Sequence, residues 1–269
     1  MDSGRQAPEL AFDGLIVDLD GVVWVGSTAV PGSIAALAAL RARGTRLVFL
    51  TNDPRGSRAE YAGRLGALGV RADESEIVTS GSALAAFVRE GEGVGTRIFV
   101  IGSPSFKGEL AQAGLEPVAG EAGREAEVVA VGGHDDFNYD ELRIAAQAVH
   151  RGARLYAAGR DATFPMPDGP WPGTGSVVAA VEVAGGRQAI AVGKPESFIF
   201  DIARSLLVGC TRIAIVGDNL AADIAGGKRA GLTTILVLTG TSGYEDVDNA
   251  EVIPDIVLPN LAALVDARR

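Results

Sequence analysis

The sequence has little cysteine, little histidine and no long hydrophobic stretch, and each absence excludes a class of protein. The one cysteine, Cys210, cannot form a disulfide within the chain. The two histidines, His134 and His150, are too few for a His-rich zinc site. No apolar run reaches the roughly 18 residues that a membrane-spanning helix needs. A disulfide-stapled module, a His-rich zinc protein and a helical membrane protein are therefore not expected.

Positive charge is also scarce. Lys and Arg number 24 against 34 Asp and Glu, which gives a formal net charge of -10. An acidic chain without a basic cluster repels nucleic acid and anionic lipid, so neither is expected as a partner. The first ten residues, MDSGRQAPEL, are polar and lack the apolar core of a signal peptide. We therefore expect a soluble, cytoplasmic protein.

The chain instead alternates short apolar runs with helical patterns. The apolar runs that predict buried strands are residues 15–20, 46–52, 213–218 and 233–238. The helical patterns lie at 33–44, 57–69 and about 221–230. Fully apolar strands separated by helices predict a doubly wound α/β fold, in which helices cover both faces of a parallel sheet.

The middle of the chain repeats this rhythm, with three more predicted strands (97–102, 127–133 and 154–159). Small-residue stretches at 79–82 and 184–186 mark candidate domain boundaries. We therefore predict a Rossmann-like core made of residues 1–81 and 189–269, with an inserted α/β domain at 82–188.

Polar residues follow three of the core strands, at the sheet edge where open parallel sheets bind ligands. The first cluster is Asp18-Leu19-Asp20-Gly21. Residues two positions apart in an extended chain point to the same side. Such a pair suits a hard divalent cation, or a pair in which one carboxylate attacks a phosphoryl group and the other carries protons. The alternative is a strand-end turn with two solvated acids.

Two further clusters carry groups that bind phosphate. Thr51 and Asn52 offer a hydroxyl and an amide as hydrogen-bond donors, or else form a helix cap or Asx-turn. Lys194, between Gly193 and Pro195, offers an ammonium group that neutralises phosphate, or else is a solvated loop lysine.

The last cluster is Asp218-Asn219, with Asp223 one helical turn later. Asp218 lies at a strand end, where its carboxylate oxygens suit Mg²⁺. Asp223 could orient the metal ligands without binding the ion itself. The alternative is helix capping by Asp218 or Asn219.

In this order, the clusters resemble the four motifs of the haloacid dehalogenase-like (HAD) hydrolase superfamily. The matching segments are DLDGV (18–22), LTN (50–52), GKP (193–195) and GDNLAAD (217–223). The long insertion between the second and third motifs is similar to that of the NagD-like, p-nitrophenylphosphatase branch, which has a type-2 cap. Local matches to that branch include TSGSA (79–83), GGHDDFNYDEL (132–142) and PGTGS (172–176).

The resemblance implies a Mg²⁺-dependent phosphatase that acts on small phosphomonoesters, with p-nitrophenyl phosphate as an artificial substrate. It implies that Asp18 is the nucleophile and that Asp20 is the acid and base. The implied metal ligands are Asp18, Asp20 through its backbone carbonyl, and Asp218. The resemblance also implies that Asp223 and Asn219 support these ligands, and that Thr51, Asn52 and Lys194 bind phosphate.

The predicted cap departs from the branch where substrate contacts are expected. This chain has Ala158-Gly159-Arg160-Asp161 where the branch often has Thr-Asn-x-Asp. We hypothesise that Arg160 binds a second anionic or polar group of the substrate; the alternative is a solvated loop arginine. His134 is expected to shape a cap turn. Relatives often dimerise through their caps, which raises a homodimer as a partner hypothesis.

Two other functions stay open for this core. One is phosphoryl transfer to another hydroxyl, as in the mutases of the superfamily, although these mostly use a smaller helical cap. The other is a non-catalytic metabolite-binding module, which the complete set of acids and the lysine argues against.

Overall fold

The computed structural model describes residues 12–166 and 168–266. The polar stretch 1–10 lies outside the described residues. The chain divides into two compact units: residues 1–49, 68–70 and 207–269 form the first unit, and residues 50–67 and 71–206 form the second unit. The predicted division into residues 1–81, 82–188 and 189–269 stays a prediction. In the described part of the chain, no helix combines the length and apolar character needed to cross a membrane.

The first unit contains the parallel sheet that was predicted from the apolar runs. Its strands lie in the order β15-β14-β13-β1-β4. Their bounds are Ile256–Leu258 (β15), Thr233–Val237 (β14), Ile213–Gly217 (β13), Gly14–Asp18 (β1) and Arg46–Thr51 (β4), whose last two residues belong to the second unit. The pairs β1–β13, β13–β14 and β14–β15 are all parallel.

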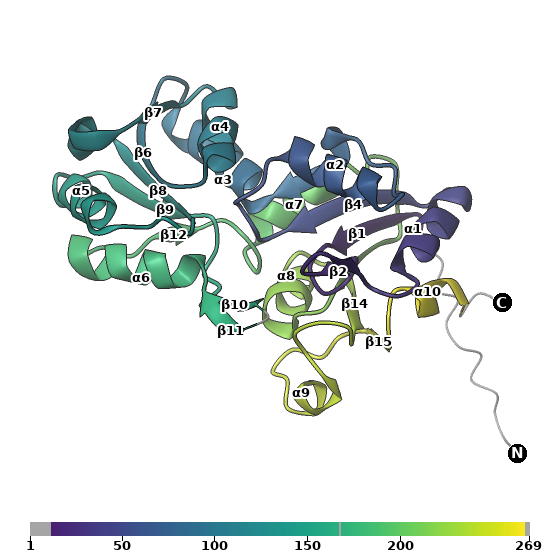
Figure 1. Ribbon diagram of the computed structural model, residues 1–269. Coiled ribbons are helices and arrows are strands. Elements are labelled where there is room, and N and C mark those ends of the chain that lie inside the picture. Colours follow the sequence, from purple (N-terminus) through teal and green to yellow (C-terminus); the bar gives the residue numbers. More distant parts are fainter. Residues whose placement is uncertain (1–11, 167, 267–269) are drawn as a thin grey trace, which may run out of the picture. The chain divides into compact units, whose positions relative to one another are not determined.

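The other elements of the first unit are short helices and a hairpin (Figure 1). Their bounds are Trp24–Val25 (β2), Thr28–Ala29 (β3), Ser33–Ala42 (α1), Leu220–Ile224 (η3, a π turn), Ala225–Arg229 (α8), Tyr244–Asp248 (α9) and Ala262–Asp266 (α10). Helix α1 buries Ser33, Ala36, Leu37 and Leu40, the spacing expected of one apolar helical face. Gly44 follows it with φ +84°, as predicted for the residue past a helix end.

The predicted helix at 221–230 is a π turn followed by a short α-helix. The Asn219 carboxamide caps the turn, since its Oδ1 accepts from the N–H groups of Ala221 (2.9 Å) and Ala222 (3.0 Å). Gly227 then lets α8 pack closely on the sheet, because a Cβ there would lie 2.4 Å from the Ile215 side chain. Helical spacing alone does not distinguish a π turn from an α-helix.

The second unit contains a separate parallel sheet in the order β12-β9-β8-β6-β7. The bounds are Ile190–Ala191 (β12), Arg154–Ala157 (β9), Val128–Gly133 (β8), Arg97–Gly102 (β6) and Glu116–Val118 (β7). Strands β6, β8 and β9 confirm the three strands predicted for the middle of the chain.

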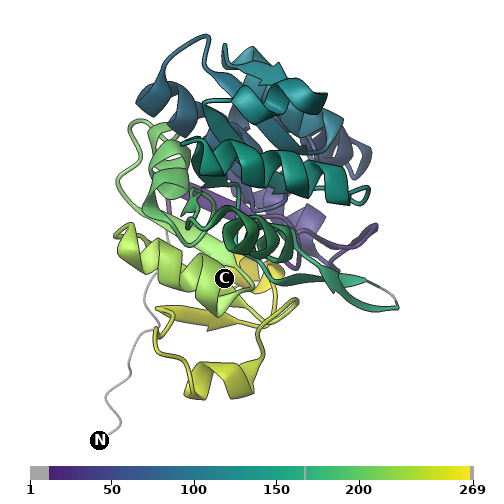
Figure 2. The ribbon, with the colours of Figure 1, turned by 90° about the vertical axis from the view of Figure 1, so that its left-hand side faces the viewer.

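Helices cover this sheet on both faces (Figure 1). The remaining elements of the second unit are Arg58–Ala67 (α2), Glu74–Glu76 (η1), Ile77–Thr79 (β5), Ser80–Glu92 (α3), Pro104–Gln112 (α4), Gly120–Glu125 (η2), Tyr139–His150 (α5), Thr174–Gly185 (α6) and Ser197–Ser205 (α7). Strands β10 (Thr163–Met166) and β11 (Gly169–Pro172) form an antiparallel hairpin that extends as a two-stranded ribbon (Figure 2). Sequence reasoning did not predict this hairpin.

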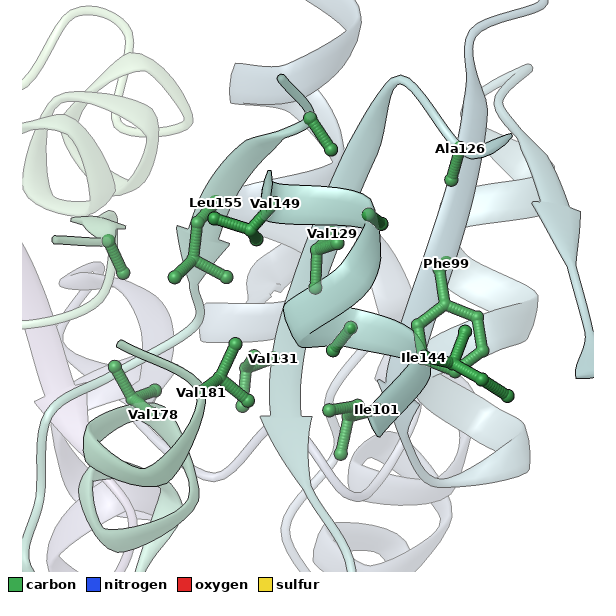
Figure 3. Close-up of a cluster of buried hydrophobic side chains, with 14 of the residues drawn as sticks. Phe99, Ile101, Ala126, Val129, Val131, Ile144, Val149, Leu155, Val178 and Val181 are labelled. Carbon is green, nitrogen blue, oxygen red and sulfur yellow. The ribbon is translucent and has the colours of Figure 1, made fainter. Parts of the chain in front are cut away.

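One face of the five-stranded sheet packs against α5 and α6. Figure 3 shows Ile144 and Val149 of α5 and Val181 of α6 on the same side of the sheet as Phe99, Val131 and Leu155, and all six belong to one buried cluster. Alternate strand residues point to this face, as the pleat requires. This cluster is a core internal to the second unit.

Phe99→Ala should lower the free energy of unfolding by about 3–5 kcal/mol, because the ring is 4% exposed and its loss leaves a cavity. Val94→Ala is the control: this side chain is 76% exposed, so its removal should change stability by less than about 0.5 kcal/mol. Urea unfolding followed by far-UV circular dichroism measures both. Equal effects of the two substitutions would contradict the packing described here.

Candidate functional site

Three buried carboxylates converge in the first unit. Asp18 ends β1, Asp218 directly follows β13, and Asp223 lies in the π turn. One carboxylate oxygen from each lies within 4.8 Å of the other two. All three residues are buried. Asp18 and Asp218 meet because β1 and β13 are adjacent and parallel, with Val17 opposite Val216, so both strands end at the same edge.

Backbone close to these carboxylates has no room for side chains. A Cβ at Gly240 would lie 1.9 Å from the Asp218 Oδ2, and a Cβ at Gly21 would lie 2.4 Å from the same oxygen. Gly21 also has φ +81°, which favours glycine. A Cβ at Gly217 would lie 2.2 Å from the Asp223 side chain. Glycine at these positions therefore lets the loops close around the acids.

Backbone N–H groups fix two of the carboxylates. The N–H of Thr241 donates to Asp218 Oδ2, and the N–H of Asn219 donates to Asp223 Oδ2 at 3.1 Å. The Thr239 hydroxyl donates to the carbonyl of Gly21 and ties the two glycine loops together. The side chains are thus oriented by the fold itself.

This arrangement suits a hard divalent cation. Close carboxylates oppose joint ionisation unless a cation lies near them, and burial strengthens that opposition. Oxygen-only donors match the preference of Mg²⁺. The structure therefore brings Asp18 and Asp218 together, as the strand ends predicted. It also places the Asp223 carboxylate in the same group, and the supporting role expected for Asp223 stays a prediction.

Asp20 lies in a different environment from Asp18. It is exposed, whereas Asp18 is buried. Its Oδ1 accepts from the indole Nε1 of Trp24 at 2.9 Å, and the Gly21 N–H donates to the Trp24 carbonyl at 2.7 Å. The tight turn over residues 19–24 therefore holds the Asp20 carboxylate at the surface. Two acids at the same strand end are separated by burial, which suits them to different tasks.

Asn219 occupies the capping position that was weighed as an alternative. Both hydrogen bonds of its Oδ1 go to the π turn, as described above. Asn219 therefore fixes the turn that carries Asp223, and its predicted support of metal ligands stays a prediction.

The second unit holds the other predicted site residues. Thr51 and Lys194 are buried, and the Thr51 Oγ1 accepts from the N–H of Asp53 at 3.0 Å. The Asn52 side chain hydrogen-bonds both the N–H and the carbonyl of Lys194, and it also donates to the Asp161 carboxylate. The structure therefore brings Asn52 and Lys194 together. It also brings Asp161 to this group, a residue for which the sequence predicted no role.

Arg160 forms an ion pair inside the second unit. Its Nη2 lies 2.7 Å from Glu182 Oε1 and donates to the carbonyl of Ala189 at 2.8 Å. Burial raises the pKa of Glu182, but the Arg160 hydrogen bond and the N–H of Ala189 outweigh it, so the pKa lies below its usual value. These contacts give Arg160 a structural role. The predicted contact of Arg160 with substrate stays a prediction.

His134 contacts the start of α5. Its Nε2 lies 3.0 Å from Glu141 Oε2, and Glu141 forms a capping box with Asn138. This matches the expectation that His134 shapes a turn.

Family models match most of the chain. A haloacid dehalogenase-like hydrolase model matches residues 15–116, and a HAD-hydrolase-like model matches residues 191–264. Human glycerol-3-phosphate phosphatase is 36% identical over 290 aligned residues, which cover 95% of this chain and 90% of that protein. Mouse chronophin is 35% identical, with 94% of this chain and 92% of that protein covered.

Solved structures of related phosphatases have the same fold as this chain. A p-nitrophenyl phosphatase from Archaeoglobus fulgidus has a TM-score of 0.88 and 33% identity, and covers 95% of this chain and 99% of its own. A glycerol phosphate phosphatase from Mycobacterium tuberculosis, solved in complex with magnesium, has a TM-score of 0.87 and 32% identity. The alignment covers 94% of this chain and 76% of that one.

Gly240→Ala should weaken binding of a divalent cation by at least about tenfold, because the new methyl group must displace the Asp218 carboxylate. Gly66→Ala is the matched control, since a Cβ there meets nothing within 4 Å. Isothermal titration with Mg²⁺ measures both variants. Wild-type affinity in Gly240→Ala would show that Asp218 does not hold the ion.

Proposed function

This chain belongs to the haloacid dehalogenase-like hydrolase family, and we propose from that membership and from its own acids that it is a Mg²⁺-dependent phosphatase of small phosphomonoesters. The single observation that carries the proposal is the convergence of Asp18, Asp218 and Asp223 within 4.8 Å. Buried carboxylates this close together are stabilised by a cation. The same cation reduces the repulsion between an attacking carboxylate and a negatively charged phosphate ester, so such an ester is a suitable substrate.

In the proposed first step, an oxygen of the Asp18 carboxylate attacks phosphorus. The bond between phosphorus and the leaving oxygen breaks, and Asp20 gives its proton to that oxygen, which leaves as an alcohol. Asp18 then carries the phosphoryl group as an aspartyl-phosphate.

In the proposed second step, the Asp20 carboxylate takes a proton from water. The hydroxide attacks phosphorus, the bond to Asp18 breaks, and inorganic phosphate is released. The exposure of Asp20 supports this assignment, because an acid that exchanges protons with water and an alcohol must reach both.

The residues that would hold Mg²⁺ are Asp18 and Asp218, with Asp223 beside them and the backbone carbonyl of Asp20 as a further ligand. The ion would supply positive charge that reduces the repulsion between the attacking carboxylate and the phosphate. We assign phosphate binding to Thr51 through its hydroxyl and to Lys194 through its ammonium group.

The substrate class follows from the relatives, whose names include glycerol-3-phosphate phosphatase and p-nitrophenyl phosphatase. Glycerol phosphate, phosphoglycolate, sugar phosphates, pyridoxal phosphate and nucleotides are the metabolites to test. A cytoplasmic location and a homodimer through the inserted domain complete the proposal. Light scattering coupled to size exclusion tests the dimer.

Asp18→Asn should lower phosphate release by at least about 10³-fold, because the amide is not a nucleophile. The measurement is release of inorganic phosphate from p-nitrophenyl phosphate and the metabolite panel, with Mg²⁺ present. The control is Asp140→Asn, which removes an exposed carboxylate that pairs only with Arg143 among the ion pairs of the described residues. Full activity of Asp18→Asn would overturn the proposed nucleophile.

Asp20→Asn should slow hydrolysis of glycerol phosphate far more than that of p-nitrophenyl phosphate. An alkoxide must be protonated as it leaves, whereas p-nitrophenolate is a stable anion and leaves without a proton. The comparison uses kcat/KM for both esters in wild type and variant. Equal losses on the two substrates would mean that Asp20 is not the acid for the leaving group.

A further inference from the structure

The Asn52 carboxamide is fully engaged by other groups of the second unit. Its Oδ1 accepts from the N–H of Lys194 at 2.8 Å. Its Nδ2 donates to the Lys194 carbonyl at 3.0 Å and to Asp161 Oδ2 at 2.9 Å. A carboxamide has two N–H donors, and both are used. Because the Lys194 N–H can only donate, it also fixes which end of the carboxamide faces it.

These bonds hold the Lys194 backbone on both sides. Asn52 grips the N–H and the carbonyl of the same residue, so the turn at 193–195 cannot shift without breaking both. The Asn52 main chain is fixed in turn, since the Ser80 hydroxyl donates to its carbonyl at 2.7 Å. Asp161 supplies the one acceptor that keeps the second Nδ2 proton, and hence the plane of the carboxamide, in place.

The loop that carries Asp161 is held by backbone hydrogen bonds from the start of α6. The Asp161 carbonyl accepts from the Gly175 N–H at 2.9 Å, and the neighbouring Ala162 carbonyl accepts from the Gly173 N–H at 2.8 Å. A Cβ at Gly173 would lie 2.3 Å from the Asp161 carbonyl oxygen, so α6 begins in close contact with this loop. The Arg160–Glu182 ion pair fixes the preceding residue.

The loop also lies directly against the lysine turn. A Cβ at Gly193 would lie 2.1 Å from the Ala158 carbonyl oxygen and 2.8 Å from Asn52 Oδ1. Only glycine at position 193 permits this close approach. It allows the Asn52 carboxamide to reach both the lysine turn and the loop that carries Asp161.

We propose that Asp161 is a positioning residue, which holds Lys194 in place through the Asn52 carboxamide. The consequence for catalysis rests on the proposed function, in which Lys194 binds the phosphate. A phosphate contact made by the Asn52 side chain would require it to give up Asp161 or Lys194. Asn52 therefore serves Lys194 rather than the substrate.

The first test is amide-resolved hydrogen exchange, which needs no activity. Asp161→Ala should speed exchange of the Lys194 amide by about tenfold, because Asn52 loses a partner and its carboxamide is freed to rotate. Asp161→Asn, which keeps an acceptor oxygen, should restore wild-type exchange. Asp201→Ala, an exposed acid on α7 that pairs with Arg204, should leave it unchanged. Wild-type exchange in Asp161→Ala would overturn the proposal.

The second test is a double-mutant cycle on p-nitrophenyl phosphate hydrolysis. Asp161→Ala and Asn52→Ala should each lower kcat/KM about tenfold, and the double variant should lose no more than Asn52→Ala alone. Asp161→Asn should stay within about threefold of wild type. Multiplied losses in the double variant would mean that Asp161 acts independently of Asn52. An equal loss in Asp161→Asn would mean that charge, not the hydrogen bond, matters.

The proposal can still be tested if a variant does not fold or if the wild-type chain is inactive. If Asp161→Ala does not fold, Asp161→Leu takes its place, since it has no acceptor and fills more volume. If the wild-type chain hydrolyses no ester, the proposed function fails, while the exchange experiment still decides whether Asp161 positions Lys194.

Discussion

The mutual repulsion of three buried carboxylates is the constraint on which the first unit is built. Asp18, Asp218 and Asp223 lie within 4.8 Å of one another, away from the water that would screen them. Held so close, they favour a cation strongly, and the surrounding structure keeps them there. Parallel strands deliver two of the acids to one sheet edge, and a π turn delivers the third. Gly21, Gly217 and Gly240 leave the space that the carboxylates fill.

Burial also distinguishes Asp18 from Asp20, in a way that fits the different tasks proposed for them. Asp18 is desolvated and lies beside other acids, where it can bind a metal and present an oxygen to an electrophile. Asp20, two residues later, is exposed and is held by Trp24. The proton transfers proposed for Asp20, to an alcohol and from water, require that access. One short turn therefore produces two carboxylates of different character from the same residue type.

The sequence predicted the parts of the molecule that follow from local pattern. Apolar runs located β1, β4, β13 and β14, and their ends located the acids, because strand ends meet at one edge of a parallel sheet. Pattern did not predict the π turn, whose spacing resembles an α-helix, or the β10–β11 hairpin, which has no strong alternation. It also could not predict that Arg160 pairs with Glu182, 22 positions away. Partners of polar side chains are set by tertiary contacts that no local pattern records.

The hydrogen bonds of Asn52 are a further example of tertiary contacts that fix a polar group, and the burial of Lys194 gives a reason why its position matters. This lysine is 5% exposed, so little water screens its charge. In a low-dielectric setting the energy of an ammonium and an anion changes steeply with the distance between them. Small displacements of the lysine would therefore weaken its attraction to an anion. Hydrogen bonds to both the N–H and the carbonyl of Lys194 limit displacements of its backbone. The acids of the first unit are fixed by close glycine packing and backbone N–H groups, and the lysine of the second unit is fixed by a neutral carboxamide. In both units, hydrogen bonds to the backbone and close glycine packing set where the charged side chains lie.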